Sequence, residues 1–173
     1  MNADSKFYQL LDALQREGVR FVVIGVSGAN FWAFHGGQIF TTKDRDLFLP
    51  PDPDNELRAW NVCERLGFDL WISDEPLGKP KDHFLAERIT ERRIVITATA
   101  SDLIVDLSLT MAGFAFDDVW NEHRVFRVDG VDVPVARLTH IVESKRIANR
   151  AKDRLFLETH AEALRQLLRG EKP

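Results

Sequence analysis

Apolar residues recur along the chain with two periods, and each period predicts a different kind of element. Between Phe7 and Leu14 they recur at helical spacing, so we predict an amphipathic first helix that is capped at Asp4 and closed by Gly18. Residues 20–25 form a continuous apolar run of β-prone residues that is too short for a helix of its own. This run predicts a central strand.

Small residues follow this strand. Ser27 and Gly28 interrupt the apolar run, and residues 29–34 predict a short helix that ends at Gly36 and Gly37. A turn of small residues between a strand and a helix lets backbone N–H groups approach a phosphate at the helix start. An ordinary strand-to-helix turn explains the same residues equally well, so both interpretations stay open.

The rest of the chain alternates predicted strands, loops and helices. Asp129-Gly130 favours a tight hairpin turn between two β-prone runs, and the polar stretch 73–82 predicts an exposed loop. The pattern as a whole predicts an α/β (α+β) fold class, with a small mixed β-sheet backed by helices. Strands are predicted at residues 44–49, 68–72, 93–97, 103–109, 125–128 and 131–135, and helices at 54–66 and in two segments between Leu138 and Gly170.

Composition and charge limit the class of protein. With 173 residues, 45% of them hydrophobic, the sequence predicts a single domain over residues 1–173 with a C-terminal helical segment at 137–169. The formal net charge of −4 demands no nucleic-acid partner. The C-terminal segment is locally basic, which fits either a polyanion site or a solvated helix face.

The N-terminus is polar and no apolar run approaches the ~20 residues of a membrane helix, so we predict an unprocessed cytoplasmic protein with no membrane partner.

Three aspartates supply the candidate chemistry. Asp44 and Asp46 lie two apart in a predicted strand, so both side chains should point to one face, with α-carbons about 6 to 7 Å apart. Two carboxylates on one face repel each other unless a cation lies between them, and magnesium prefers oxygen ligands from carboxylates and substrate phosphates. Asp106 interrupts an apolar strand, where a buried carboxylate needs a cation or hydrogen-bond donors. Taken one at a time, a solvated pair, a helix cap or an exposed strand edge explains these residues as well.

Together, these residues resemble the polymerase-β-like nucleotidyltransferase superfamily. Its members share a Gly-containing turn after the first strand, an Asp-x-Asp on the next strand and a third Asp on a later strand, and all three features occur here in that order. The sequence looks more narrowly like the minimal nucleotidyltransferases related to AbiEii toxins, over about residues 10–160. The segments that carry this likeness are 18–25, 42–46, 51–55, 105–107 and 144–153.

The resemblance implies a nucleotidyltransferase fold and a set of site residues. The implied ligands of two magnesium ions are Asp44, Asp46 and Asp106. The implied nucleotide-binding residues are Gly25, Ser27, Gly28, Thr42 and Lys145. Lys145 and Asp153 match a lysine and an aspartate that complete related toxin sites, where Lys145 would neutralise phosphate charge and Asp153 would orient it or assist proton transfer. A surface lysine and a helix cap explain these two residues equally well.

The implied activity is the magnesium-dependent transfer of a nucleoside monophosphate from a nucleoside triphosphate to a hydroxyl acceptor, with release of pyrophosphate. An RNA end, a protein or a small molecule could be the acceptor, and an antitoxin could be a partner. Val26 stands where a second glycine is usual, Phe40 where arginine is frequent, and Arg45 where an apolar residue is common. These departures make an alternative credible, a catalytically degenerate member that binds nucleotide or a partner protein. A glycosyltransferase fits less well, because such enzymes usually need a larger Rossmann-like domain.

Other residue types show no pattern of a catalytic or metal site. The five histidines lack metal-ligand spacing, the serines lack a nucleophile-elbow pattern, and no Walker-type lysine loop occurs. Cys63 stands alone among apolar residues, which predicts a small buried hydrophobe.

Overall fold

The computed structural model describes residues 1–34 and 40–171, which form one mixed eight-stranded β-sheet and eight α-helices. The strands are β1 (Val22–Ile24), β2 (Asp44–Phe48), β3 (Asp69–Ile72), β4 (Glu75–Pro76), β5 (Ile96–Ala100), β6 (Leu103–Ser108), β7 (Arg124–Val128) and β8 (Val131–Val135). The helices are α1 (Ala3–Arg16), α2 (Gly25–Phe34), α3 (Pro53–Arg65), α4 (His83–Glu91), α5 (Phe116–Trp120), α6 (Leu138–Ala148), α7 (Ala151–Thr159) and α8 (Ala161–Gly170). The predicted mixed sheet backed by helices is confirmed.

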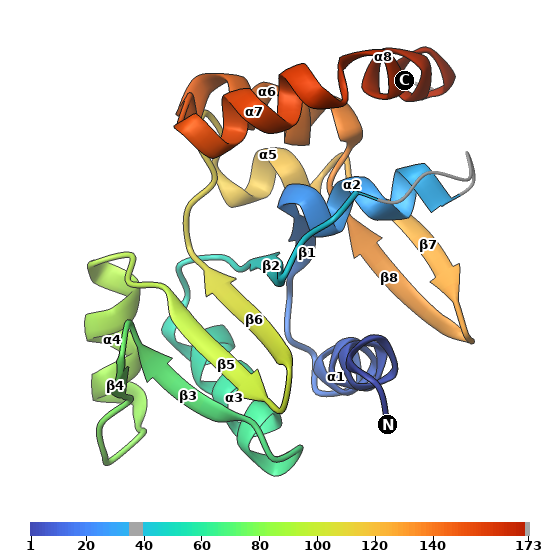
Figure 1. The fold of residues 1–173 in the computed structure, drawn as a ribbon. Helices are drawn as coiled ribbons and strands as arrows, with labels where there is room; N and C mark the ends of the chain where they lie inside the picture. Colours follow the sequence, from blue (N-terminus) through green and yellow to red (C-terminus); the bar gives the residue numbers. More distant parts are fainter. Residues whose placement is uncertain (35–39, 172–173) are drawn as a thin grey trace.

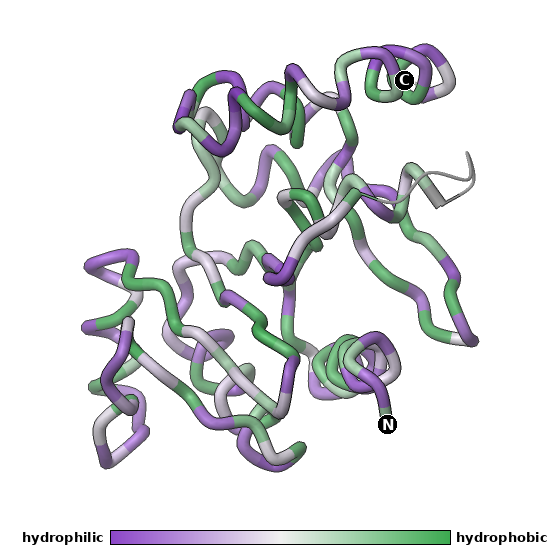
Figure 2. The backbone as a smooth tube through the Cα atoms, viewed as in Figure 1, coloured by the Kyte–Doolittle hydropathy of each residue, from purple (hydrophilic) through white to green (hydrophobic). Residues whose placement is uncertain are grey.

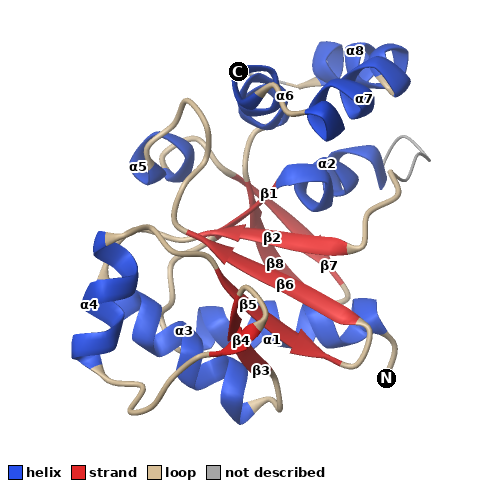
Figure 3. Cartoon of the chain, turned by 60° about the vertical axis from the view of Figure 1, so that its left-hand side comes forward, coloured by secondary structure: helices blue, strands red, loops and turns tan. Residues whose placement is uncertain are grey.

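The sheet has the strand order β4-β3-β5-β6-β2-β1-β8-β7. β2 pairs with β6 in parallel and β1 with β8 in parallel, while the other neighbouring strands are antiparallel. Helices cover both faces: α1, α3 and α4 lie on one side of the sheet, and α2 and α5 to α8 on the other (Figures 1 and 3). β2 and β6 are therefore central strands with a helical layer on each side.

Each helical layer packs its own apolar core against the sheet. Leu10 of α1 and Trp60 of α3 belong to one buried cluster, and Leu138 of α6 and Leu164 of α8 belong to the other. In Figure 2 hydrophobic and hydrophilic colours alternate along α1 and along the C-terminal helices, as expected of helices with one packed face. No helix among the described residues combines the length and the apolar content that crossing a bilayer requires.

The alternation along β6 determines which side chains reach which layer. Leu103, Val105 and Leu107 are buried in the core beneath α1 and α3. Because successive side chains of a strand point to opposite faces, Asp106 and Ser108 point toward the layer that contains α2, α6 and α7. The polar positions of this central strand thus face one layer only.

The hairpin predicted near the C-terminal third is confirmed. β7 and β8 pair antiparallel, and Asp129 and Gly130 adopt φ angles of 51° and 80° between them. Positive φ at both central positions is what a tight hairpin turn requires.

The cap predicted for the first helix was wrong. Asn2, rather than Asp4, precedes α1, and its side-chain oxygen accepts a 2.8 Å hydrogen bond from the backbone N–H of Ser5. Asp4 lies inside the first turn, where its charge suits the positive end of the helix dipole.

The start of the second helix was also predicted too late in the chain. α2 begins at Gly25 and not at residue 29, because Gly25 adopts a φ of 65° and turns the chain directly from β1 into the helix. Ser27 and Gly28 consequently lie in the first turn of α2. Gly36 and Gly37, which were predicted to end the helix, lie outside the described residues.

The middle of the chain contains three elements that the pattern did not predict. The stretch expected to be an exposed loop includes β4, which pairs with β3, and buries Leu77 just after it. α4 begins after Asp82, whose side chain accepts a hydrogen bond from the N–H of Leu85. α5 follows β6.

The strand predicted at 93–97 starts later, at Ile96, because the N–H of Arg93 still bonds to a carbonyl at the end of α4.

The C-terminal segment forms three helices rather than the predicted two. Asn149 adopts a left-handed φ of 52°, and its N–H bonds to the carbonyl of Lys145, so that α6 ends there. α7 and α8 are separated only at His160. Neither break contains a glycine or a proline, the residues from which a helix end is most readily predicted.

Candidate active site

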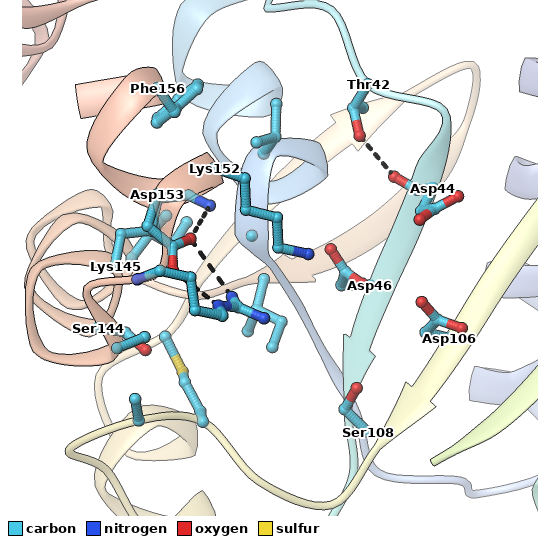
Figure 4. Close-up of a pocket in the computed structure, with 18 of the residues that line it drawn as sticks. Thr42, Asp44, Asp46, Asp106, Ser108, Ser144, Lys145, Lys152, Asp153 and Phe156 are labelled. Atoms are coloured by element: carbon cyan, nitrogen blue, oxygen red, sulfur yellow. Dashed lines mark hydrogen bonds and ion pairs between the residues drawn. The ribbon is translucent and has the colours of Figure 1, made fainter. Parts of the chain in front are cut away.

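Asp46 and Asp106 lie side by side on the two central strands. β2 and β6 run parallel, with Asp46 in register with Asp106. Leu47, the next residue of β2, is buried in the opposite core, so Asp46 points to the same face as Asp106. Asp44 lies two residues earlier on β2, shares this face and is exposed. Figure 4 shows all three carboxylates on the sheet side of one pocket.

Gly25 lets the start of α2 approach Asp46 closely. A Cβ at Gly25 would lie 2.5 Å from Oδ2 of Asp46, and the φ of 65° is itself unfavourable for other residues. Glycine alone meets both requirements without strain. The N-terminal end of α2 is therefore held against the carboxylates.

The carboxylates line a cavity of about 820 Å³ between the sheet and the C-terminal helices. Gly25 and Thr42 lie on the sheet side, and Lys145 of α6 and Lys152 of α7 lie on the helical side. Figure 4 shows Lys152 extending from α7 toward Asp46. Acidic and basic walls thus face each other across one space.

The proximity of the carboxylates changes their acidity. Burial, followed by the charges of Asp106 and Asp44, raises the pKa of Asp46 to about 6. Burial also raises the pKa of Asp106, although a hydrogen bond from Thr97 and the charge of Lys152 oppose the shift. Ionisation of Asp46 and Asp106 therefore costs free energy in this cavity, and a cation bound between the carboxylates would lower that cost.

On the helical wall, Asp153 contacts Lys145. The Nζ of Lys145 lies 3.5 Å from Oδ1 of Asp153 and 5.0 Å from the ring centre of Phe156. The Asp153 side chain is fully buried and also accepts hydrogen bonds from the backbone N–H and the Nε of Arg150, at 3.2 and 2.7 Å. These contacts favour the orienting role for Asp153.

The pKa shifts on this wall follow from the same contacts. Burial would raise the pKa of Asp153, but hydrogen bonds from Arg150 and the charge of Lys145 outweigh it and hold this pKa below its ordinary value. Burial lowers the pKa of Lys145, and Asp153 opposes that shift. Lys145 is thus an ordered, partly desolvated cation at the cavity.

Ser27 and Gly28, predicted to bind nucleotide, lie behind the cavity rather than on its surface. Ser27 is buried, and its hydroxyl donates to the carbonyl of Ile24 at 2.8 Å and accepts from the N–H of Asp46 at 3.0 Å. A Cβ at Gly28 would lie 2.9 Å from Cδ1 of Ile141, so Gly28 permits close packing of α2 on α6. Because α2 starts at Gly25, earlier than predicted, Ser27 and Gly28 lie in its first turn and point into the core.

Gly25 and Val26 line the cavity at this end of α2. Thr42, predicted to bind nucleotide, also lines it, and its hydroxyl donates to the carbonyl of Asp44 at 3.0 Å. The part of the early turn that could meet a phosphate is therefore the beginning of the helix.

The departures from the pattern of the family that the sequence resembles differ in their effect on the cavity. Arg45 points to the other face of the sheet, where its guanidinium pairs with Asp4 at 2.7 Å and lies over the ring of Phe7. Phe40 is buried, whereas Val26 lines the cavity. The positive charge of Arg45 is thus kept away from the carboxylates.

The donor set fits a divalent cation in its chemistry, but it is not a ready-made metal site. Among the described residues, no three His, Cys, Asp or Glu side chains are grouped closely enough to hold an ion. One oxygen of Asp106 accepts a hydrogen bond from Thr97, and no hydrogen bond within the described part of the chain reaches the carboxylate of Asp46. Carboxylate oxygens with excess negative charge suit magnesium, which completes its shell with water and phosphate.

The sequence pattern missed three contributors to the cavity surroundings. Thr97 pairs with Asp106 across β5 and β6, which a register between these two strands could have revealed. Lys152 stands directly before Asp153 and lines the cavity, but a single lysine in a basic segment carries no signal of its own in the sequence. His160 lines the cavity although it has no metal-ligand spacing.

Comparison with known proteins gives a structural relative only. Nothing matched in a scan against models of protein families, and no match was found among curated proteins. A matching solved structure is the solution structure of the antibiotic-resistance factor ANT(2'')-Ia, an aminoglycoside nucleotidyltransferase, with a TM-score of 0.50 and 14% identity over 96% of this chain and 97% of that one. The chain has the nucleotidyltransferase fold. At this identity the likeness concerns the fold alone. The function of the cavity therefore has to follow from the residues that line it in this chain.

Proposed function

We propose that the protein is a nucleotidyltransferase, which moves a nucleoside monophosphate from a nucleoside triphosphate to a hydroxyl acceptor and releases pyrophosphate. The in-register pair Asp46 and Asp106 carries this proposal, because it faces Lys145 and Lys152 across one cavity. Paired carboxylates suit divalent cations, and the facing lysines suit the phosphates that those cations accompany. The similarity of the fold to that of an aminoglycoside nucleotidyltransferase supports the reaction class.

In this proposal Asp44, Asp46 and Asp106 hold two magnesium ions. Magnesium, when bound, supplies a Lewis acid that stabilises charge on the phosphoryl oxygens. The raised pKa of Asp46 supports the assignment, since a divalent cation would favour its charged form.

The residues of the chain would position the reactants and move the proton. The acceptor oxygen forms a bond to the α-phosphorus, and the bond between that phosphorus and the oxygen of the pyrophosphate breaks. Asp106 accepts the proton of the acceptor hydroxyl on the oxygen that Thr97 leaves free. Lys145 and Lys152 stabilise the charge on the departing pyrophosphate, and the start of α2 at Gly25 contributes backbone N–H groups.

The finer assignment to an AbiEii-like toxin, with an antitoxin partner, is also a proposal. It is supported by the order of the sequence motifs and by the lysine and aspartate pair Lys145 and Asp153 at the cavity. Expression in a host cell tests it: growth arrest by the wild type, but not by Asp46→Ala, is expected of a toxin. Equal growth with both would remove the toxin role and leave the transfer reaction standing.

The transfer reaction is tested with α-labelled nucleoside triphosphates and magnesium. Transfer RNA, cell protein and aminoglycosides serve as separate acceptor pools, because the acceptor is an RNA end, a protein or a small molecule in this proposal. Wild type should label one pool, while Asp46→Asn and Asp106→Asn should lower the label at least a hundredfold. Asp69→Asn, an exposed aspartate at the start of β3, serves as the matched control. Labelling that persists in both cavity variants would contradict the mechanism.

The alternative is a protein of this fold that binds nucleotide or a partner without turnover. Two observations favour it: Val26 lines the cavity where the family usually has glycine, and the described residues hold no ready-made metal group. Calorimetry of nucleotide binding with and without magnesium, beside the labelling assay, separates the two functions. Magnesium-dependent binding with no labelled product in any pool would favour the alternative.

A further inference from the structure

The cavity beside the carboxylates has two chemically different ends. The acidic strands face the N-terminal part of α7, where Lys152 lies. Toward the other end of α7 the lining residues themselves carry no carboxylate, lysine or arginine. These residues are Thr41, Thr42, Leu155, Phe156, Thr159 and His160. Charged groups border this end where Lys145 lies over Phe156 and where Thr42 bonds to the carbonyl of Asp44. In Figure 4 Phe156 and Thr42 lie toward one end of the pocket, and Ser108 and Ser144 toward the other.

One face of α7 connects the charged end with the uncharged end. Lys152 and Phe156 of α7 and the C-cap residue His160 follow one another at intervals of four residues, so they lie along one side of the helix and its end. With a rise of ~1.5 Å per residue, Lys152 and His160 are about 12 Å apart along the axis. A ligand that spans this face needs an anionic end and an uncharged end that can stack and form hydrogen bonds.

Three rings form the wall at the uncharged end. The ring centre of His160 lies 4.7 Å from that of Phe40 and 5.1 Å from that of Phe156, and the two phenylalanine rings are 5.2 Å apart, edge to face. Phe40 is buried and supports the other two rings from behind. No hydrogen bond within the described part of the chain uses a side-chain nitrogen of His160, so the imidazole can donate to or accept from a ligand in the cavity.

We propose that this aromatic end binds the base of the nucleoside triphosphate and that His160 discriminates between bases, an inference that rests on the proposed function. The imidazole supplies the surface for stacking, which tolerates any base, and the ring of Phe156, over which Lys145 lies at 5.0 Å, supports it. The imidazole nitrogens and the hydroxyl of Thr159 supply the hydrogen bonds that distinguish one base from another.

Calorimetry with five ligands tests the proposal on the full chain in the presence of magnesium. The ligands are ATP, GTP, CTP, UTP and inorganic tripolyphosphate, which offers the phosphates without a base. The variants are His160→Ala, which removes both stacking and hydrogen bonding, and His160→Phe, which keeps an aromatic ring. His83→Ala, at an exposed histidine of α4, is the matched control.

Wild type should bind one nucleoside triphosphate at least about tenfold more tightly than tripolyphosphate. His160→Ala should lower that affinity about tenfold and leave tripolyphosphate binding unchanged, because the phosphates meet the other end of the cavity. His160→Phe should keep most of the affinity and reduce the differences among the four bases to about twofold. His83→Ala should behave as wild type.

Two results would overturn the proposal, and they are distinguishable. If wild type prefers a nucleotide over tripolyphosphate and both His160 variants keep its affinity and its base preference, the base binds elsewhere while the transfer function stands. If wild type binds neither nucleotides nor tripolyphosphate, the proposed function fails and the base subsite fails with it.

Discussion

Thr97 donates a 2.7 Å hydrogen bond to Oδ1 of Asp106, its register partner on the neighbouring antiparallel strand. The bond fixes one oxygen of the carboxylate and opposes the rise in its pKa that burial causes. The position of one of the three aspartates therefore depends on a residue that has no charge of its own.

Replacement of Thr97 by valine should weaken divalent-cation binding about tenfold, since a hydrogen bond to a charged group contributes roughly 1.5–3 kcal/mol. Valine keeps the shape of the side chain but not the hydrogen bond, so the free energy of unfolding should also fall, by roughly 1–3 kcal/mol. Titration of manganese, monitored by its paramagnetic signal in the presence of nucleotide, measures the affinity. Thr97→Ser keeps the hydroxyl and should stay within about threefold of wild type. Equal affinity in the valine variant would show that Asp106 needs no such support.

Gly25→Ala should lower both stability and nucleotide binding. A methyl group there would lie 2.5 Å from Oδ2 of Asp46, at a φ of 65°. Gly67→Ala is the matched control, because Gly67 has a φ of 86° and nothing within 4 Å of its Cβ position. Left-handed backbone costs both variants roughly 1–2 kcal/mol, so the added loss in Gly25→Ala reports the contact with Asp46. Urea unfolding measures it, and equal losses in the two variants would argue against a close approach.

Arg45 should be neutral for ligand binding although it separates the two aspartates of the Asp-x-Asp. Its guanidinium pairs with Asp4 on the far side of the sheet, at 2.7 Å. Arg45→Leu should therefore leave magnesium-dependent nucleotide affinity within about twofold of wild type and cost about 0.5 kcal/mol of stability, as partly exposed ion pairs do. A tightening of tenfold or more would mean that the charge of Arg45 reaches the carboxylates.

The parts of the site that were predictable from the sequence depend on local periodicity. The period of two along β2 correctly predicted that Asp44 and Asp46 share one face, because a strand alternates its faces regardless of what packs on it. The place of Asp106 beside them was implied by the family resemblance and not by periodicity. The hairpin at Asp129-Gly130 was predictable because it too depends on local sequence: these two residue types readily adopt the positive φ angles of the turn.

The parts that were not predictable depend on contacts between distant segments. The first position of α2 excludes a side chain because Asp46, which is distant in sequence, lies against Gly25. Ser27 is turned inward by its hydrogen bond to the N–H of Asp46, and Thr97 gains its partner only through strand register. No periodicity within a single segment contains this information.

Glu56 is a buried acid outside the cavity, and it makes the stability of the fold depend on pH. Its Oε1 accepts a 3.0 Å hydrogen bond from Nε1 of Trp60, whereas Oε2 is buried and has no hydrogen-bond partner among the residues that the structure describes. Burial raises the pKa of Glu56 from its ordinary value of 4.5 to about 8, although the bond from Trp60 opposes the shift. The folded protein therefore holds this proton more tightly than the unfolded chain does.

The sign of the pH dependence follows from this difference. Below pH 4.5 the carboxyl is protonated in the folded and the unfolded state, so it does not affect the free energy of unfolding. Between pH 4.5 and 8 this free energy falls by up to roughly 1.4 kcal/mol per pH unit, because the unfolded chain releases the proton first. Glu56→Gln keeps an oxygen for Trp60 and cannot ionise, so it should gain a few kcal/mol over wild type at pH 8 and little at pH 4.5. Urea unfolding at both pH values measures the gain, with Glu91→Gln on the exposed end of α4 as the control. A gain that does not grow with pH would mean that Glu56 ionises as freely in the folded protein as in the unfolded chain.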